Sequence, residues 1–142
     1  MKIQTILATK GTRVITAQAG QTLREAIGLM IQHNIGALIV VDEADKPVGV
    51  LSERSILLAA ARTDQFFEQP VREVMRTPVI VASPQDDLES VMQTMTVKRN
   101  RHIPVIDQGQ LIGIVSVGDM VKARLDEYQG AVETLETQIV GE

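Results

Sequence analysis

The stretch that decides the fold lies in the second half of the chain, where residues 102–119 read HIPVIDQGQLIGIVSVGD. Two apolar runs of strand length, residues 103–106 and 111–115, are separated by a polar turn. Ser116 and Asp119 follow with the spacing of a helix N-cap and its third helical residue. The stretch therefore predicts a strand, a turn, a second strand and a helix in succession.

The same order of residues occurs earlier in the chain. When residues 14–42 are laid over residues 79–107, seven of the 29 positions are identical. Farther along, GVLS at residues 49–52 matches GIVS at residues 113–116, and the apolar residues of 3–7 match those of 71–75. The sequence thus predicts two copies of one unit, at residues 1–67 and 68–127, followed by a tail at residues 128–142.

Each copy predicts the same elements. A short strand (residues 14–16 and 79–81) precedes a helix with apolar residues at i, i+3, i+4 and i+7, which begins near Leu23 and Leu88 after the capping residues Thr22 and Asp87. Two strands follow, at residues 37–41 and 48–51 in one copy and 103–106 and 111–115 in the other. A closing helix covers residues 53–61 or begins at residue 117.

The strands are continuous apolar runs, which is typical of strands covered on both faces. One unit cannot cover both faces of its own strands, but a second copy can. We therefore expect an α/β (α+β) fold with two tandem β-α-β-β-α repeats related by a pseudo-twofold axis, and a C-terminal helix.

Composition excludes several functions. Aromatic residues are only 2% of the 142, so the core is aliphatic and base-stacking surfaces are absent. The net charge of −4 argues against nucleic acid as a partner, and zero cysteine excludes thiol chemistry and thiolate metal sites. The sequence has no apolar run that would serve as a signal peptide or membrane span. We expect a soluble, cytoplasmic protein with no membrane partner.

Two interpretations fit Ser116 and Asp119. They can form a capping box, in which serine caps the helix and the carboxylate complements its dipole. They can also form a ribose clamp, because a carboxylate can accept hydrogen bonds from both hydroxyls of a ribose diol. The two roles are compatible.

Cations gather just before the strand at residues 103–106. Lys98 and Arg99 suit a helix C-terminus, whereas Arg101 and His102 lie where they could face the same cleft as Asp119 and neutralise phosphate.

In the first copy, Ser52 and Ser55 stand where Ser116 and Asp119 stand. Arg54 is either a helix-surface residue or reaches a phosphate, and Lys10 with Gly11 forms either a turn or a loop that approaches the ligand.

Catalysis has little support in the sequence. The two histidines, His33 and His102, lie on different copies, and no histidine pair has the spacing of a zinc site. Nucleophile-elbow and Walker patterns are missing as well. We predict no enzyme activity, no catalytic residue and no metal.

The two copies, with HIPVID at residues 102–107 and GIVSVGD at residues 113–119, resemble the CBS domain, and a tandem pair of these domains is a Bateman module. The resemblance covers residues 1 to about 127. The chain is most similar to stand-alone bacterial CBS-pair proteins, which share a Lys-Gly before the first strand and a stretch like GVLSER at residues 49–54.

The resemblance implies two clefts between the copies that bind adenine-containing ligands such as AMP, ADP, ATP, NAD or S-adenosylmethionine. It implies that Asp119 and Ser116 hold the ribose, that Arg101 and His102 hold phosphate, and that Ile114 packs nearby. The base would lie near the first copy, against Lys10, Ile15, Ile35 and Gly36. A weaker second cleft would involve Ser52, Ser55, Arg54 and Ile80, where serine replaces the usual aspartate.

Two functions remain open at the level of the sequence. One is a non-catalytic adenine-nucleotide sensor that regulates a separate effector protein. The other is a dimerising scaffold whose nucleotide cleft is vestigial. The tail predicts a helix to about residue 140 with an apolar stripe in heptad spacing, for which we expect a homodimer. The stripe consists of Val121, Leu125, Tyr128, Val132, Leu135 and Ile139.

Overall fold

Residues 1–140 are described by the computed structural model, and both copies contain the predicted helices. The elements of the first copy are α1 (Ile3–Lys10), β1 (Thr16–Gln18), α2 (Leu23–His33), β2 (Ala37–Val41), β3 (Pro47–Ser52) and α3 (Glu53–Arg62). Those of the second are the short 3₁₀ turns η1 (Phe66–Glu68) and η2 (Val71–Glu73), then α4 (Leu88–Lys98), β4 (His102–Asp107), β5 (Gln110–Ser116) and α5 (Val117–Val140).

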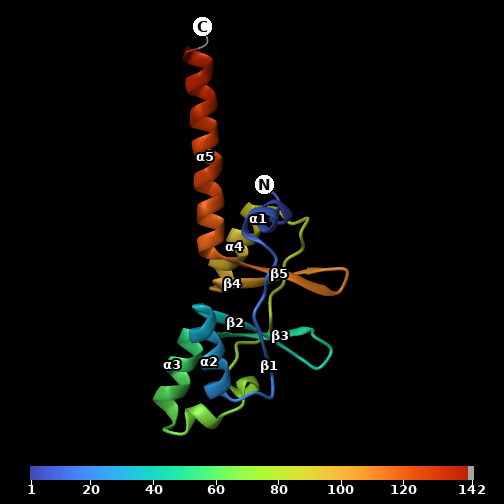
Figure 1. Cartoon of the computed structure of the whole chain (residues 1–142), viewed down its shortest axis with the longest axis vertical. Helices are drawn as coiled ribbons and strands as arrows, with labels where there is room; N and C mark the ends of the chain where they lie inside the picture. Colours follow the sequence, from blue (N-terminus) through green and yellow to red (C-terminus); the bar gives the residue numbers. More distant parts are fainter. Residues whose placement is uncertain (141–142) are drawn as a thin grey trace.

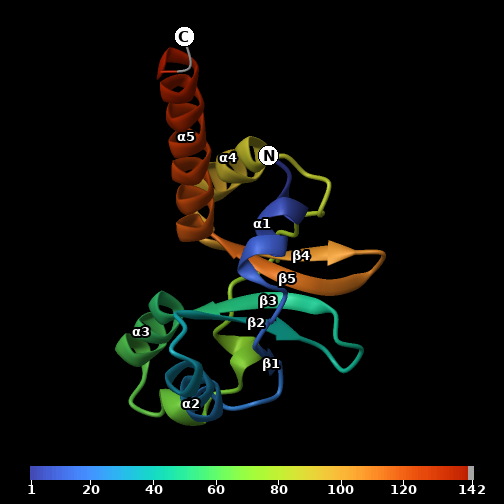
Figure 2. The same cartoon turned by 45° about the horizontal axis from the view of Figure 1, so that its top comes forward.

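The strands form two small sheets that lie one above the other between layers of helices (Figure 1). In the first sheet β1 pairs with β2 in parallel and β2 pairs with β3 antiparallel, while β4 and β5 form an antiparallel pair. Helices α2 and α3 cover the outer face of one sheet, and α1 and α4 cover the other (Figures 1 and 2). All five residues of β2 are buried, as their continuous apolar run predicts.

The helix starts follow the predicted capping chemistry. The Thr22 hydroxyl accepts from the Glu25 N–H at 3.2 Å and donates to the Glu25 carboxylate, so threonine caps α2. The Asp87 carboxylate accepts from the Glu89 N–H at 3.0 Å. Helices α2 and α4 therefore begin where a side chain satisfies a free backbone N–H.

The amphipathic segment that opens each copy packs into the core of the other copy. Ile3, Ile6 and Leu7 of α1 are buried with α4, β4, β5 and the start of α5. Val71, which opens the second copy, is buried with the first copy, and Val74 and Met75 pack against the same cluster. This exchange ties the copies together and carries Lys10, at the end of α1, to the second copy.

The predicted strand at residues 79–81 does not form. In the second copy the parallel pairing shrinks to a single bridge between Ala82 and Val105, the counterparts of Ala17 and Val40. Pro104 stands where the first copy has Ile39, and proline has no N–H to donate to a neighbouring strand. The first copy's strand is also shifted, to Thr16–Gln18, from the predicted 14–16.

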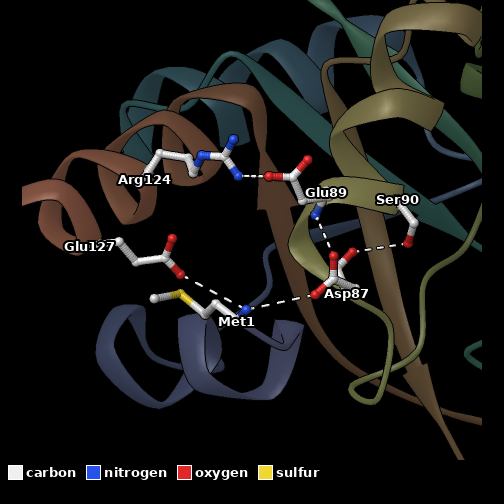
Figure 3. A network of polar contacts seen from close by, with 6 residues as sticks. All are labelled: Met1, Asp87, Glu89, Ser90, Arg124 and Glu127. Carbon is white, nitrogen blue, oxygen red and sulfur yellow. Dashed lines mark hydrogen bonds and ion pairs between the residues drawn. The ribbon is translucent and has the colours of Figure 1, made fainter. Parts of the chain in front are cut away.

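Helix α5 extends beyond the body of the molecule (Figure 1). Met120 and Ala123 in its first turns are buried in the core. Two ion pairs also hold these turns: Arg124 pairs with Glu89, and the Glu127 carboxylate lies 3.8 Å from the Met1 amino nitrogen (Figure 3). From Tyr128 to Ile139 its apolar stripe is exposed. Along residues 1–140, no helix is long and apolar enough to cross a lipid bilayer.

Candidate functional site

Asp119 and Ser116 close a reciprocal capping box where β5 passes into α5. The Asp119 N–H donates to the Ser116 hydroxyl at 3.1 Å, and the Ser116 N–H donates to Asp119 Oδ2 at 2.8 Å. This arrangement fixes the carboxylate at a helix N-terminus, where the dipole favours negative charge. The predicted capping box is therefore present, and its geometry leaves the carboxylate available for a second role.

Lys10 lies directly on this carboxylate. Its Nζ is 2.5 Å from Asp119 Oδ2 and donates to the Ile114 carbonyl at 2.7 Å. The side chains are 30% and 23% exposed, so the ion pair sits at the mouth of a partly sheltered site. Within the described residues, Asp119 Oδ2 takes both hydrogen bonds to the carboxylate and Oδ1 takes none.

The environment of this site lowers the pKa values of Asp119 and His102. Burial alone would raise the pKa of Asp119, but hydrogen bonds from Lys10 and Ser116 hold that pKa below its usual value. Burial lowers the pKa of His102, and the positive charges of Lys10 and Arg101 lower it further, against the opposing effect of Asp119 and Glu53. The structure thus favours an ionised aspartate beside a neutral histidine.

Arg101 and His102 line a cleft of about 400 Å³ between the two copies. The register of β4 and β5 places His102 opposite Ser116, so the cleft lies next to the capping box. Asp119 and Lys10 themselves line a separate cavity of about 400 Å³. From the first copy, Gly36, Ser52 and Arg54 line the same cleft. The predicted phosphate residues therefore face both copies.

The remaining predicted residues divide into two groups. Lys10 and Ile114 lie at the capping box, where the Ile114 carbonyl accepts a hydrogen bond from Lys10, and Gly36 lines the cleft with His102. Ile15 and Ile35 instead pack against the core of the first copy, and Ile80 packs against the core of the second. Ile35 also lines a separate hollow with Gly36.

The first copy's version of the capping box lacks a carboxylate. The Ser55 N–H donates to the Ser52 hydroxyl at 3.2 Å, and the two hydroxyl oxygens are 3.1 Å apart. These serines line a cavity of about 370 Å³ with Arg54 and Arg76. A hydroxyl pair can hydrogen-bond a sugar, but it cannot supply the charge that Asp119 supplies.

Two arginines near the cleft were missed by the sequence reasoning. Arg76, which lies between η2 and α4 of the second copy, has no role in the sequence-based prediction, and Arg99 is interpreted there as a helix-end cation. Both line the cleft with Arg101 and His102. The internal repeat could have identified them, because alignment of the copies places uncharged Ala8 and Asn34 opposite Arg76 and Arg99.

The fold and the repeated strand–helix turn define a tandem CBS-domain protein. The family model for the CBS domain matches residues 8–62 and again residues 71–126, so the chain belongs to this family. It is 37% identical to the CBS domain-containing protein YhcV of Bacillus subtilis over 127 residues, which are 89% of this chain and 90% of that protein.

Solved structures agree with this assignment. The CBS-domain containing protein ATU1752 from Agrobacterium tumefaciens has a TM-score of 0.81 and 34% identity, covering 87% of this chain and 92% of that one. The CBS domain pair of protein MJ0100, solved with 5′-methylthioadenosine and S-adenosyl-L-methionine, has a TM-score of 0.78 and 28% identity, covering 89% and 98%. The predicted family and fold are thereby confirmed.

Proposed function

We propose that this chain is a non-catalytic regulatory module that binds an adenine nucleotide in the cleft between its two CBS copies. The observation that carries the proposal is the Asp119 carboxylate, held at a helix N-terminus with Oδ1 not engaged by any described residue. A ribose diol can donate two hydrogen bonds to such a carboxylate. The adenosine portion of both ligands in the MJ0100 structure supports this class of ligand.

The cations beside the clamp favour a phosphate on that adenosine. Arg101 and His102 line the cleft, and a guanidinium binds phosphate oxygens with charge-assisted hydrogen bonds. A sulfonium ligand would bring a positive charge toward the same cations. AMP, ADP, ATP or NAD therefore fits this chain better than S-adenosylmethionine, and its effect would pass to a separate effector protein.

We expect one strong site in each chain. The second copy offers the Asp119 carboxylate, with Arg101 and His102 in the neighbouring cleft, whereas the cavity at Ser52 and Ser55 offers hydroxyls in place of the carboxylate. Calorimetric titration with AMP should give about one nucleotide per chain. Two equal sites would contradict the weaker role assigned to Ser55.

The clamp is tested by Asp119→Ala. Loss of one or two charge-assisted hydrogen bonds, worth roughly 1.5–3 kcal/mol each, should weaken AMP binding at least about tenfold. The matched control is Glu133→Ala, which removes an exposed carboxylate from the same helix, away from the cavity of Asp119. Calorimetric titration measures both affinities, and circular dichroism checks that each variant is folded.

Lys10→Met tests whether the Asp119 carboxylate binds the ribose directly, independently of the charge on Lys10. This variant removes the ion pair but leaves the carboxylate, so uncharged adenosine no longer has to displace an ammonium group. Adenosine should then bind more tightly than to the unmodified chain. If Asp119→Ala binds AMP as well as the Glu133→Ala control does, Asp119 is a capping residue alone.

We further propose that the module works as a homodimer joined through α5. Six apolar residues of this helix are 46–73% exposed, and they recur in heptad spacing along one stripe. A twofold contact would bury the same stripe from both chains. Removal of residues 129–142 should produce monomers in light scattering. A dimer that survives the deletion would place its interface on other CBS helices.

A further inference from the structure

Four arginines from four separate segments gather at the cleft between the copies. Arg54 lies in the first turn of α3, Arg76 between η2 and α4, Arg99 at the C-cap of α4 and Arg101 just before β4. All four line the same cleft and also a neighbouring cavity of about 500 Å³. The positive charge at this place is therefore shared by both copies.

This charge is not balanced by carboxylates. Among the residues that the structure describes, Glu53 is the one acidic residue that lines the cleft. Among residues 1–140, none of the four guanidinium groups has a carboxylate oxygen within 4.0 Å, although Arg24 and Arg124 elsewhere do. Like charges held together in a partly enclosed cleft repel one another, and a bound polyanion would offset that repulsion.

Two of the arginines are positioned by the backbone. The Arg76 guanidinium donates to the Arg99 carbonyl at 2.6 Å and also to the Lys98 carbonyl, so it is fixed at the end of α4. Arg99 itself has a left-handed backbone with φ of 55°, as its counterpart Asn34 does with φ of 52°. Asparagine adopts this conformation readily, whereas arginine there is uncommon and points to a functional reason.

Alignment of the copies shows that each arginine stands opposite an uncharged residue. Arg99 and Arg101 align with Asn34 and Gly36, and Arg54 and Arg76 align with Gly118 and Ala8. A copy can therefore fold without a cation at these positions, although in this chain Arg76 also binds two carbonyls at the end of α4. Only their convergence at one cleft gives the charges a common role.

We propose that the four arginines bind a chain of phosphates, so that the ligand of this module is an adenosine di- or triphosphate and the cluster distinguishes it from AMP. This inference rests on the proposed nucleotide function. Arg54 and Arg76 also line the cavity of Ser52 and Ser55. The cluster thus extends from the cleft at His102 toward the first copy, far enough to offer cations to more than one phosphate.

The test is calorimetric titration with AMP, ADP, ATP and inorganic tripolyphosphate in magnesium-free buffer. We expect affinity to rise with phosphate number, with ATP at least about tenfold tighter than AMP, and the difference to shrink as salt is added. The double variant Arg76→Gln/Arg99→Asn should lose this difference and still bind AMP. Arg99→Asn restores the residue that the first copy uses, which favours folding. Arg72→Gln, an exposed arginine outside the cleft, is the control.

The outcomes separate the two proposals. Equal affinities for AMP and ATP in the unmodified chain, or an ATP advantage that survives in the double variant, would overturn the polyphosphate site and leave the nucleotide function standing. Binding of tripolyphosphate without any adenine nucleotide would overturn the nucleotide function and support the arginine site. Binding of none of the four would overturn both.

Discussion

His102 is the residue at the site whose charge can change near neutral pH. It is flanked by the cations Lys10 and Arg101 and by the carboxylates of Asp119 and Glu53, and burial is the largest cause of its lowered pKa. The folded chain therefore holds this imidazole neutral at pH values where an unfolded histidine, with a pKa near 6.5, takes up a proton.

This difference makes stability depend on pH. Between the lowered pKa of folded His102 and about 6.5, the unfolded chain binds more protons than the folded chain, so the free energy of unfolding rises with pH and levels off above that window. Melting temperatures between pH 5 and pH 8 should show the rise. The rise of melting temperature with pH should flatten in His102→Gln and persist in His33→Gln. An unchanged rise in His102→Gln would show that another titratable group causes it.

At the residue scale, the sequence predicted the parts of the site better than their contacts. The capping box of Ser116 and Asp119 follows from local spacing, and the structure contains it. The Lys10–Asp119 ion pair was not predictable, because it depends on which copy receives α1. Periodicity shows that a helix has an apolar face, but it does not identify the surface that face covers.

At the scale of elements, a glycine at the same place in each copy lets the exchanged segments approach the sheets. A Cβ on Gly49 would lie 2.5 Å from Met75 Sδ and 3.1 Å from the Arg76 carbonyl oxygen. A Cβ on its counterpart Gly113 would lie 2.7 Å from a Leu7 methyl group. The repeated GVLS and GIVS stretches thus encode a close contact between copies.

Gly49→Ala should therefore destabilise the fold. Overpacking of this kind costs about 1–3 kcal/mol. Gly28→Ala is the matched control, because Gly28 lies inside α2 with nothing within 4 Å of the added Cβ, and alanine there should stabilise the helix by roughly 0.5–1 kcal/mol. Urea unfolding measures both variants. A neutral Gly49→Ala would show that Met75 moves aside at little cost.

An apolar pattern predicts which residues can form a strand, but it does not predict whether that strand finds a partner. Residues 37–41 form β2 within the predicted bounds, since a continuous apolar run specifies a doubly covered strand. Residues 79–81 have a similar apolar run, yet pairing there depends on a donor in the neighbouring strand. Pro104 removes that donor, so an element can fail because of a residue more than twenty positions away.

At the scale of the whole molecule, the two CBS copies close their cores without the end of α5. The core of the second copy takes α5 only as far as Met120 and Ala123, and the later stripe residues are exposed. An apolar stripe on a helix that extends away from the body is a surface suited to a second helix. A second copy of the chain presents that same stripe.

The charges beside the stripe favour antiparallel pairing. Lys122 and Glu136 occupy the same flanking position of the heptad, two heptads apart. When two copies of α5 run in opposite directions about residue 130, Lys122 of each helix lies beside Glu136 of the other. In a parallel pair Lys122 and Glu136 lie beside Val117 and Ala131, and no opposite charges meet.

Charge reversal therefore distinguishes the two arrangements and tests the dimer. Lys122→Glu and Glu136→Lys should each weaken dimerisation, because each places like charges beside one another twice in the antiparallel pair. The double variant should restore it, since both pairs are re-formed with their signs exchanged. Sedimentation velocity over a range of concentrations measures the three dimer affinities, with the unmodified chain as reference. Single variants that dimerise as well as the unmodified chain would rule out antiparallel pairing of α5, and a monomer at every concentration would rule out the dimer itself.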